Sequence, residues 1–170
     1  LVLTSPGIPM LFQGQEFLQG EWFRDDVPLD WDLNEEFHGL VRLYRDLAKL
    51  RLNRQGVTRG LCGQHIQVTH VNEAENMVVF QRWDEHGPGD DVIIVANCSN
   101  AAKENYLIGL PEAGVWKLRI NTDASIYSDD FSNCVSGDLT AGQGERDGLQ
   151  AQAPVSIGPY SVLIYSKDRA

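Results

Sequence analysis

The distribution of apolar and polar positions divides the chain into two parts with different periodicities. Near the start, residues 8–12 are apolar at four of five positions and do not alternate with polar residues. This is the pattern of a strand buried on both faces, as in a parallel sheet. Pro9 lies at the beginning of the run, where a strand tolerates a missing amide donor. A long polar loop follows over residues 13–33 and leads into a helical pattern, so the sequence predicts one βα unit.

The helical pattern is the clearest periodicity in the chain. Asn34 is expected to cap the helix, and Glu35 and Glu36 suit the positive end of its dipole. Apolar residues then recur at helical spacing, at Phe37, Leu40, Val41, Tyr44, Leu47 and Ala48. Gly56 is able to end the helix, and the apolar stripe is interpreted as core packing rather than as a ligand site.

From residue 59 onward the chain changes to short apolar runs separated by turn residues. Seven strands are predicted, over residues 64–71, 77–83, 92–97, 105–110, 115–120, 153–157 and 161–166. The stretch 123–150 is rich in aspartate and glycine and is predicted to be one long loop. Closely spaced strands without a helical pattern indicate an antiparallel β-sandwich or barrel. The chain is therefore expected to be mainly β, with a domain boundary near residues 54–60.

Charge and cysteine content narrow the classes of partner. There are 14 Lys and Arg against 24 Asp and Glu, which gives a net charge of −10. An acidic surface does not attract a phosphate backbone or an anionic bilayer, so neither nucleic acid nor membrane is expected as a partner. Cys62, Cys98 and Cys134 lack CxxC spacing and are interpreted as reduced thiols in a cytoplasmic protein. The opening letters LVLTSPG are interpreted as the interior of a longer chain.

Few residues offer metal or acid–base chemistry. His65 and His70 are five residues apart on a predicted strand, which would place them on opposite faces. The acidic pairs at 25–26, 90–91 and 129–130 lack the spacing of a calcium loop and are expected to be solvated. Serine-hydrolase, nucleotide-binding and zinc-protease motifs are absent from the sequence. No metal, cofactor or catalytic residue is therefore assigned.

The loop over residues 13–33 is the candidate site for a neutral ligand. Trp22, Phe23 and Trp31 offer aromatic faces, and the carboxylate of Glu16 lies among glutamines. Sugars have apolar faces and hydroxyl rims, so aromatic rings beside amides and carboxylates suit them. The alternative is that the tryptophans only fill the space beneath the loop, and composition leaves both interpretations open.

Several linked motifs resemble one known family. The eighth strand and following loop of the α-amylase superfamily barrel resemble the segment PGIPMLFQGQEF. Bacterial 1,4-α-glucan (glycogen) branching enzymes of that superfamily resemble the next segments, EFLQGEWFRDDVPLDWDL and HGLVRLYRDLAKL. Their C-terminal all-β domain resembles FQRWDE, VIIVANCSNAAKENYLIGLPEAGVWK and INTDASIY. The resemblance implies the last βα unit of a (β/α)8 catalytic barrel over residues 1–56 and a C-terminal all-β domain over residues 57–170.

The resemblance also implies a retaining transglycosylase that cleaves α-1,4 and forms α-1,6 linkages in glycogen synthesis. Its catalytic carboxylates follow barrel strands that would lie upstream of Leu1, so no residue here inherits a catalytic role and the piece alone is expected to be inactive. Glu16, Trp22 and Trp31 are the residues expected to contact an α-glucan, either glycogen or a maltooligosaccharide. The other expected partner is the missing barrel domain of the same chain, on which the β-domain would pack.

Other hypotheses remain at this point. The segment containing Pro9 fits an α-amylase or a trehalose-type hydrolase equally well, and a stand-alone carbohydrate-binding β-module or a structural sandwich would need no catalytic parent. In the isolated chain a strand at residues 8–12 would have no partner. It is therefore expected to be disordered, packed on the β-domain or paired with a second copy.

Overall fold

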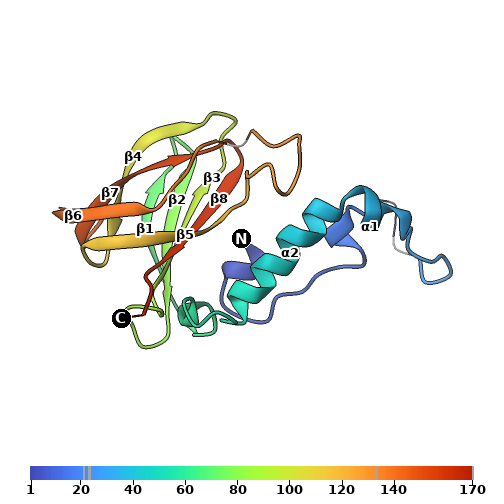
Figure 1. The fold of residues 1–170 in the computed structure, drawn as a ribbon, viewed down its shortest axis with the longest axis horizontal. Helices are drawn as coiled ribbons and strands as arrows, with labels where there is room; N and C mark the ends of the chain where they lie inside the picture. The colour runs from blue at the N-terminus through green and yellow to red at the C-terminus, as the bar shows by residue number, and fades with distance from the viewer. Residues whose placement is uncertain (21, 23, 133, 170) are drawn as a thin grey trace.

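A computed structural model describes residues 1–20, 22, 24–132 and 134–169. An all-β body stands beside an N-terminal arm that carries the helices (Figure 1). The arm contains the 3-10 turns η1 (Val2–Thr4) and η2 (Gln15–Phe17), the helices α1 (Asp32–Glu36) and α2 (His38–Arg51), and the turn η3 (Arg59–Leu61). The body contains β1 (His65–Asn72), β2 (Met77–Trp83), β3 (Val92–Asn97), β4 (Lys103–Leu110), β5 (Gly114–Asn121), β6 (Leu139–Arg146), β7 (Leu149–Ile157) and β8 (Ser161–Ser166).

The strands form one eight-stranded sheet in the order β1-β2-β3-β8-β5-β6-β7-β4, and every pairing is antiparallel. The sheet folds back on itself, so that its inner face encloses an apolar core in which Trp116 is the largest fully buried side chain. The prediction of a mainly β, antiparallel sandwich or barrel is confirmed.

A second apolar core lies between the outer face of the sheet and α2. The helix contributes Leu43, Leu47 and Leu50, which pack against Phe80, Ile94 and neighbouring strand residues. Of the predicted helical stripe only Leu47 takes part in this core, whereas Val41 and Tyr44 are half-buried elsewhere on the helix. The helix is therefore apolar on two sides, and the side that covers the sheet is not the one that the sequence predicted.

The helix boundaries also differ from the prediction. Asn34 lies inside α1 rather than capping it, and Phe37 (φ −104°, ψ 30°) separates α1 from α2. The second helix ends at Arg51, before Asn53 turns left-handed at φ +50° and accepts a 2.9 Å bond from the Thr58 amide. An asparagine side chain that holds this turn explains why the helix ends before the glycine that was expected to close it.

Residues 8–12 do not form a strand, and that prediction is wrong for this chain. Ile8 is 98% exposed and Met10 is 75% exposed, so the segment is not packed on the β-domain either. The guanidinium of Arg51 fixes only its start, donating to the carbonyls of Ser5 (2.6 Å) and Gly7 (2.5 Å). A strand needs a neighbour to bond its amides and carbonyls, and the described strands all belong to the β-body.

Part of the predicted long loop is sheet, because β6 and the first residues of β7 lie within residues 123–150. Leu139 and Ala141 point into the core, as in a strand with alternating apolar residues. Gly142 and Gly144 follow, so the sequence does not continue this apolar–polar alternation. The remaining loop is tied by Asp123. Its carboxylate accepts bonds from the amide (3.0 Å) and hydroxyl (2.5 Å) of Ser132 and from the amide of Cys134 (2.8 Å).

The prediction that the two β1 histidines lie on opposite faces is wrong. His65 pairs with Trp83 and His70 pairs with Val79, and these partners point to the same face of β2. A bulge between Val68 and His70 inserts an extra residue and shifts the alternation by one position.

The prediction that the acidic pairs are solvated is wrong for residues 90–91, because both side chains are buried. Asp90 accepts bonds from the amides of Asp84 (2.8 Å) and Glu85 (2.6 Å), and Asp91 accepts one from the Gln81 side chain (2.7 Å). These carboxylates organise the turn before β3, which composition could not show. The other two acidic pairs are exposed, as predicted.

Candidate functional site

The candidate loop is organised by η2 and the residues around it. Gly14 adopts φ +76°, and a Cβ there would lie 2.7 Å from atoms of both Phe17 and Gln19. Only glycine therefore allows the loop to fold this tightly over Phe17, which is almost fully buried against α2. The ring of Trp31 packs on Phe17 with centroids 5.5 Å apart.

The far part of the loop is closed by side-chain bonds. Gln19 Oε1 accepts a 2.8 Å bond from the amide of Asp30, and Arg24 forms a two-point pair with Asp26 at 3.1 and 2.9 Å. Between these contacts lies an open hollow of about 320 Å³. Its apolar wall includes Phe12, Leu18, Trp22 and Val27, and its polar groups include the amides of Gln13, Gln15 and Gln19.

The structure brings some of the predicted site residues together and leaves others apart. Trp22 lines the hollow and is 93% exposed, and Gln13, Gln15 and Gln19 of the same loop line it as well. Trp31 does not line the hollow; it packs on Phe17 and is itself 65% exposed. Glu16 is half-buried on η2 and does not line the hollow either. Phe23, and the acid at position 21, lie outside the described residues. Arg24 and Leu18, which also line the hollow, carried no signal in the sequence.

The hollow suits binding more than bond cleavage. Among the described residues that line it there is no carboxylate, histidine or cysteine, so no general acid or nucleophile faces it. Over the described ranges, no cluster of three or more His, Cys, Asp and Glu could hold a metal ion. The three cysteines are free, and no described helix is long and apolar enough to cross a membrane.

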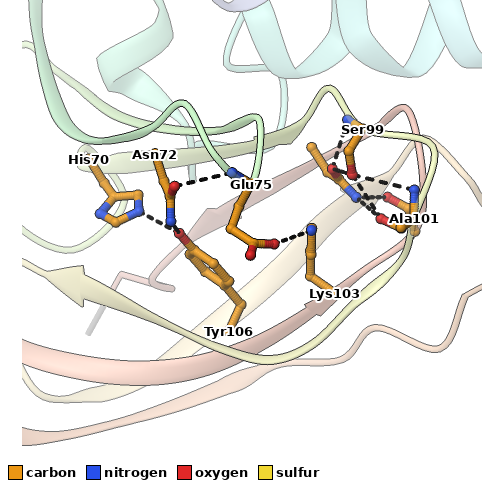
Figure 2. A network of polar contacts seen from close by, with 9 residues as sticks. His70, Asn72, Glu75, Ser99, Ala101, Lys103 and Tyr106 are labelled. Atoms are coloured by element: carbon orange, nitrogen blue, oxygen red, sulfur yellow. Dashed lines mark hydrogen bonds and ion pairs between the residues drawn. The ribbon is translucent and has the colours of Figure 1, made fainter.

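A second polar cluster lies away from the hollow, where β1 meets β4 (Figure 2). The ring of His70 lies 2.9 Å from Asp147 Oδ1 through Nδ1 and 2.7 Å from the Tyr106 hydroxyl through Nε2. Asn72 donates to the same hydroxyl at 2.9 Å, so the hydroxyl can donate to Nε2 while Nδ1–H donates to Asp147. Every group then has a partner. Because β1 and β4 end the sheet order, this cluster joins its two edges and is structural.

The fold and its motifs define the class of protein. The family model described as "Alpha amylase, C-terminal all-beta domain" matches residues 68–168, which includes nearly all of the β-body. The chain belongs to this family, and the resemblance found in the sequence is confirmed.

Three curated relatives of the chain are enzymes of the same kind. The chain is 32% identical to the 1,4-alpha-glucan branching enzyme GlgB of Roseobacter denitrificans, over 92% of this chain and 20% of the relative. The corresponding values are 32%, 96% and 22% for the GlgB of Rhizobium meliloti, and 34%, 91% and 22% for that of Corynebacterium jeikeium. The chain therefore spans about a fifth of the length of these relatives.

Solved structures support the fold alone, since their sequence identities are low. A pullulanase from Anoxybacillus sp. LM18-11, complexed with maltotetraose, matches with a TM-score of 0.60 at 16% identity, over 98% of this chain and 22% of that one. The alpha-amylase from H.orenii matches with a TM-score of 0.56 at 18% identity, over 98% of this chain and 33% of that one.

Proposed function

We propose that the chain is the C-terminal portion of a 1,4-α-glucan branching enzyme, in which it has a non-catalytic role. In this proposal residues 1–56 form the last βα unit of a (β/α)8 catalytic barrel, and residues 57–170 form the all-β domain that packs on the barrel and stabilises it. The chemistry is that of a retaining enzyme, whose two carboxylates stand roughly 5 Å apart on the barrel. The parent is cytoplasmic and acts on an α-glucan, without a nucleic-acid or membrane partner.

The exposed apolar segment at residues 8–12 is the observation that carries the proposal. Soluble proteins rarely leave a run of large apolar side chains in water, and Ile8 and Met10 are 98% and 75% exposed. Such a strand would be buried in a parallel sheet that is covered on both faces. The second apolar side of α2, with Val41 and Tyr44 half-buried, is what a helix between a barrel strand and the β-domain requires.

The hollow beside η2 is proposed as one wall of the glucan site, with Trp22 as its stacking surface. Trp31 and Glu16, which lie outside the hollow, are the other two residues proposed to contact the glucan. Trp31 packs on Phe17, and Glu16 is half-buried on η2. We expect Trp22→Ala in the full-length enzyme to raise KM for amylose roughly 3- to 10-fold, because a stacked ring contributes on the order of 1 kcal/mol. The same change should leave the unfolding of the 170-residue chain unaltered, because Trp22 is 93% exposed.

The proposal is tested by incubating the natural full-length protein with amylose. Branching lowers the iodine colour and releases few reducing ends, whereas an α-amylase or trehalose-type hydrolase releases reducing ends as the colour falls. The 170-residue chain alone should do neither. Loss of colour with a parallel rise in reducing ends would replace the branching assignment by hydrolysis.

A stand-alone carbohydrate-binding module is the second candidate, supported by the exposed Trp22 beside three glutamines. Calorimetric titration of maltoheptaose into the 170-residue chain separates the two functions. An incomplete site that needs a barrel should give no measurable heat of binding. Saturable binding that Trp22→Ala abolishes would favour the module.

A further inference from the structure

One strand of the β-body carries an exposed apolar strip that the hollow and the helix do not use. Ile66, Val68 and Val71 of β1 pair with Arg82, Phe80 and Val78 of β2, so the three β1 side chains point to the same face. That face is the outer one, which α2 covers farther along the sheet. Val68 is 54% exposed, and its two neighbours in the strip are exposed as well.

The strip continues an interface that already exists. Phe80, the partner of Val68, is buried in the core beneath α2, and Val78, the partner of Val71, packs against that core. Apolar side chains on the outer face therefore extend from beneath the helix, through Phe80 and Val78, to Val68 and Val71 on β1. Contiguous exposed apolar surface beside a buried interface indicates that a further partner completes the cover.

The N-terminal turn η1 is fastened beside this strip. Arg82, which pairs with Ile66, is fully buried, and its Nη1 donates to the carbonyl of Thr4. Leu1 and Val2, at the start of the turn, are exposed apolar residues. Thr4, three residues after Leu1, is thus held beside Ile66, so chain preceding Leu1 would begin close to the strip.

We propose that Ile66, Val68 and Val71 form a second contact surface for the barrel, covered by the part of the longer chain that precedes Leu1. This inference rests on the proposed function and adds to it. The barrel then contacts the β-domain twice, through α2 and directly on β1. Two contacts on one face would fix the angle between the two domains. A contact through α2 alone would allow the domains to rotate about the helix axis.

A second copy of the chain is a poorer occupant. Edge strands pair with copies of themselves when they are flat and unblocked. Here β1 is bulged between Val68 and His70, and its far end is bridged to β4 through Tyr106. Both features hinder edge-to-edge pairing, while the side chains of the strip stay available to a partner that lies on the face.

The direct test is hydroxyl-radical footprinting of the full-length protein and of the 170-residue chain. Oxidation of Ile66, Val68 and Val71 should fall severalfold in the full-length protein. Val115 is the internal control, because it is 48% exposed on β5, which is not a neighbour of β1 in the sheet. Equal oxidation of the strip in both proteins would overturn the inference.

A matched pair of substitutions supplies the second arm. In the full-length protein Val68→Lys should restore the oxidation of Ile66 and Val71 and lower the melting temperature, while Val115→Lys should do neither. In the 170-residue chain the two substitutions should behave alike. If that chain is instead a dimer that Val68→Lys converts to a monomer, the strip is a self-association surface and the inference is wrong. Amylose activity, assayed in parallel, reports on the proposed function independently of the strip.

Discussion

At the scale of single residues, Arg82 is the least expected feature of the molecule. Its guanidinium is fully buried and donates to the carbonyls of Gly63 (2.6 Å) and His65 (2.9 Å), as well as to that of Thr4. No described carboxylate forms an ion pair with it. Burial lowers the pKa of Arg82, and the nearby charge of Arg51 adds to this. Five donors in a fixed fork let one side chain hold two separate chain segments on β2.

Arg82→Met should therefore be strongly destabilising. Several buried carbonyls would lose their donor, and each unsatisfied group costs on the order of 1 to 3 kcal/mol. We expect the free energy of unfolding of the 170-residue chain to fall by about 3 kcal/mol, and the amides of η1 to exchange faster with deuterium. Arg54→Met, at an exposed position, is the control and should change little. An effect of Arg82→Met no larger than the control would mean that the carbonyls find water instead.

For Tyr165 we predict that removing a polar group does not destabilise the protein, in contrast to Arg82→Met. Its ring is fully buried, and its hydroxyl has no hydrogen-bond partner within the described part of the chain. Tyr165→Phe should leave stability unchanged or raise it by up to about 1 kcal/mol, because an unpaired buried hydroxyl is unfavourable. Tyr106→Phe, which removes a hydroxyl bonded to Asn72 and His70, should cost about 1 to 2 kcal/mol in the same urea titration. Equal losses in both variants would show that Tyr165 has a partner, such as a buried water.

The same residue predicts a pH dependence. Burial raises the pKa of Tyr165 above its ordinary value of 10.0, so the unfolded chain ionises this phenol first. Stability contributed by the neutral folded phenol is complete below that value and is lost as pH rises above it. Urea midpoints between pH 9 and pH 11 should fall in the wild type, and fall less in Tyr165→Phe. An identical slope in the two proteins would assign the loss to other groups.

At the scale of elements, the contact between α2 and the loop before β6 is unusually close. A Cβ added to Gly39, near the start of α2, would overlap the carbonyl oxygen of Tyr127. Helix propensity alone predicts that Gly39→Ala stabilises, by up to about 1 kcal/mol. The overlap predicts instead a loss of about 1 to 3 kcal/mol in thermal unfolding, because backbone must move. Gly20→Ala, where nothing lies within 4 Å, is the control and should be neutral.

The elements also show where the sequence sufficed and where it did not. Buried strands with flanking turns, such as β2, β3 and β8, were predicted with their observed bounds, because each contains a continuous apolar run. The strand β6 was missed because glycines break its alternation. Residues 8–12 have a strand pattern without a sheet to join. The pattern of apolar residues shows that a segment is able to form a strand. Whether the strand forms depends on a neighbouring strand elsewhere in the molecule.

At the scale of the candidate site, the sequence predicted the loop but not its geometry. Trp22 was predicted from its residue type and lines the hollow, whereas Trp31 was predicted on the same grounds and packs on Phe17. Both are tryptophans in a polar loop, so composition could not separate them. The difference lies in the folded loop, in which Trp31 packs on Phe17 while Trp22 lines the hollow.

At the scale of the whole molecule, the two parts of the chain differ in how completely they are buried. Its β-domain has a complete inner core, while its N-terminal arm exposes residues 8–12 and leaves one side of α2 half-covered. Limited proteolysis should reflect this difference. In the 170-residue chain we expect cleavage within residues 8–30 well before any cut in the β-body, since local opening requires few buried contacts to be lost there. The full-length protein should resist cleavage at the same segment, and equal susceptibility would argue against a barrel around it.

Under the proposed function, this chain is the C-terminal part of an enzyme that makes α-1,6 branches. Proton NMR of amylose incubated with the full-length protein measures this directly, because α-1,4 and α-1,6 anomeric protons are resolved from each other and from reducing ends. We predict a growing α-1,6 signal, no matching growth of reducing-end signal, and no change with the 170-residue chain alone. Growth of reducing ends without α-1,6 linkages, or branching by the 170-residue chain itself, would contradict it.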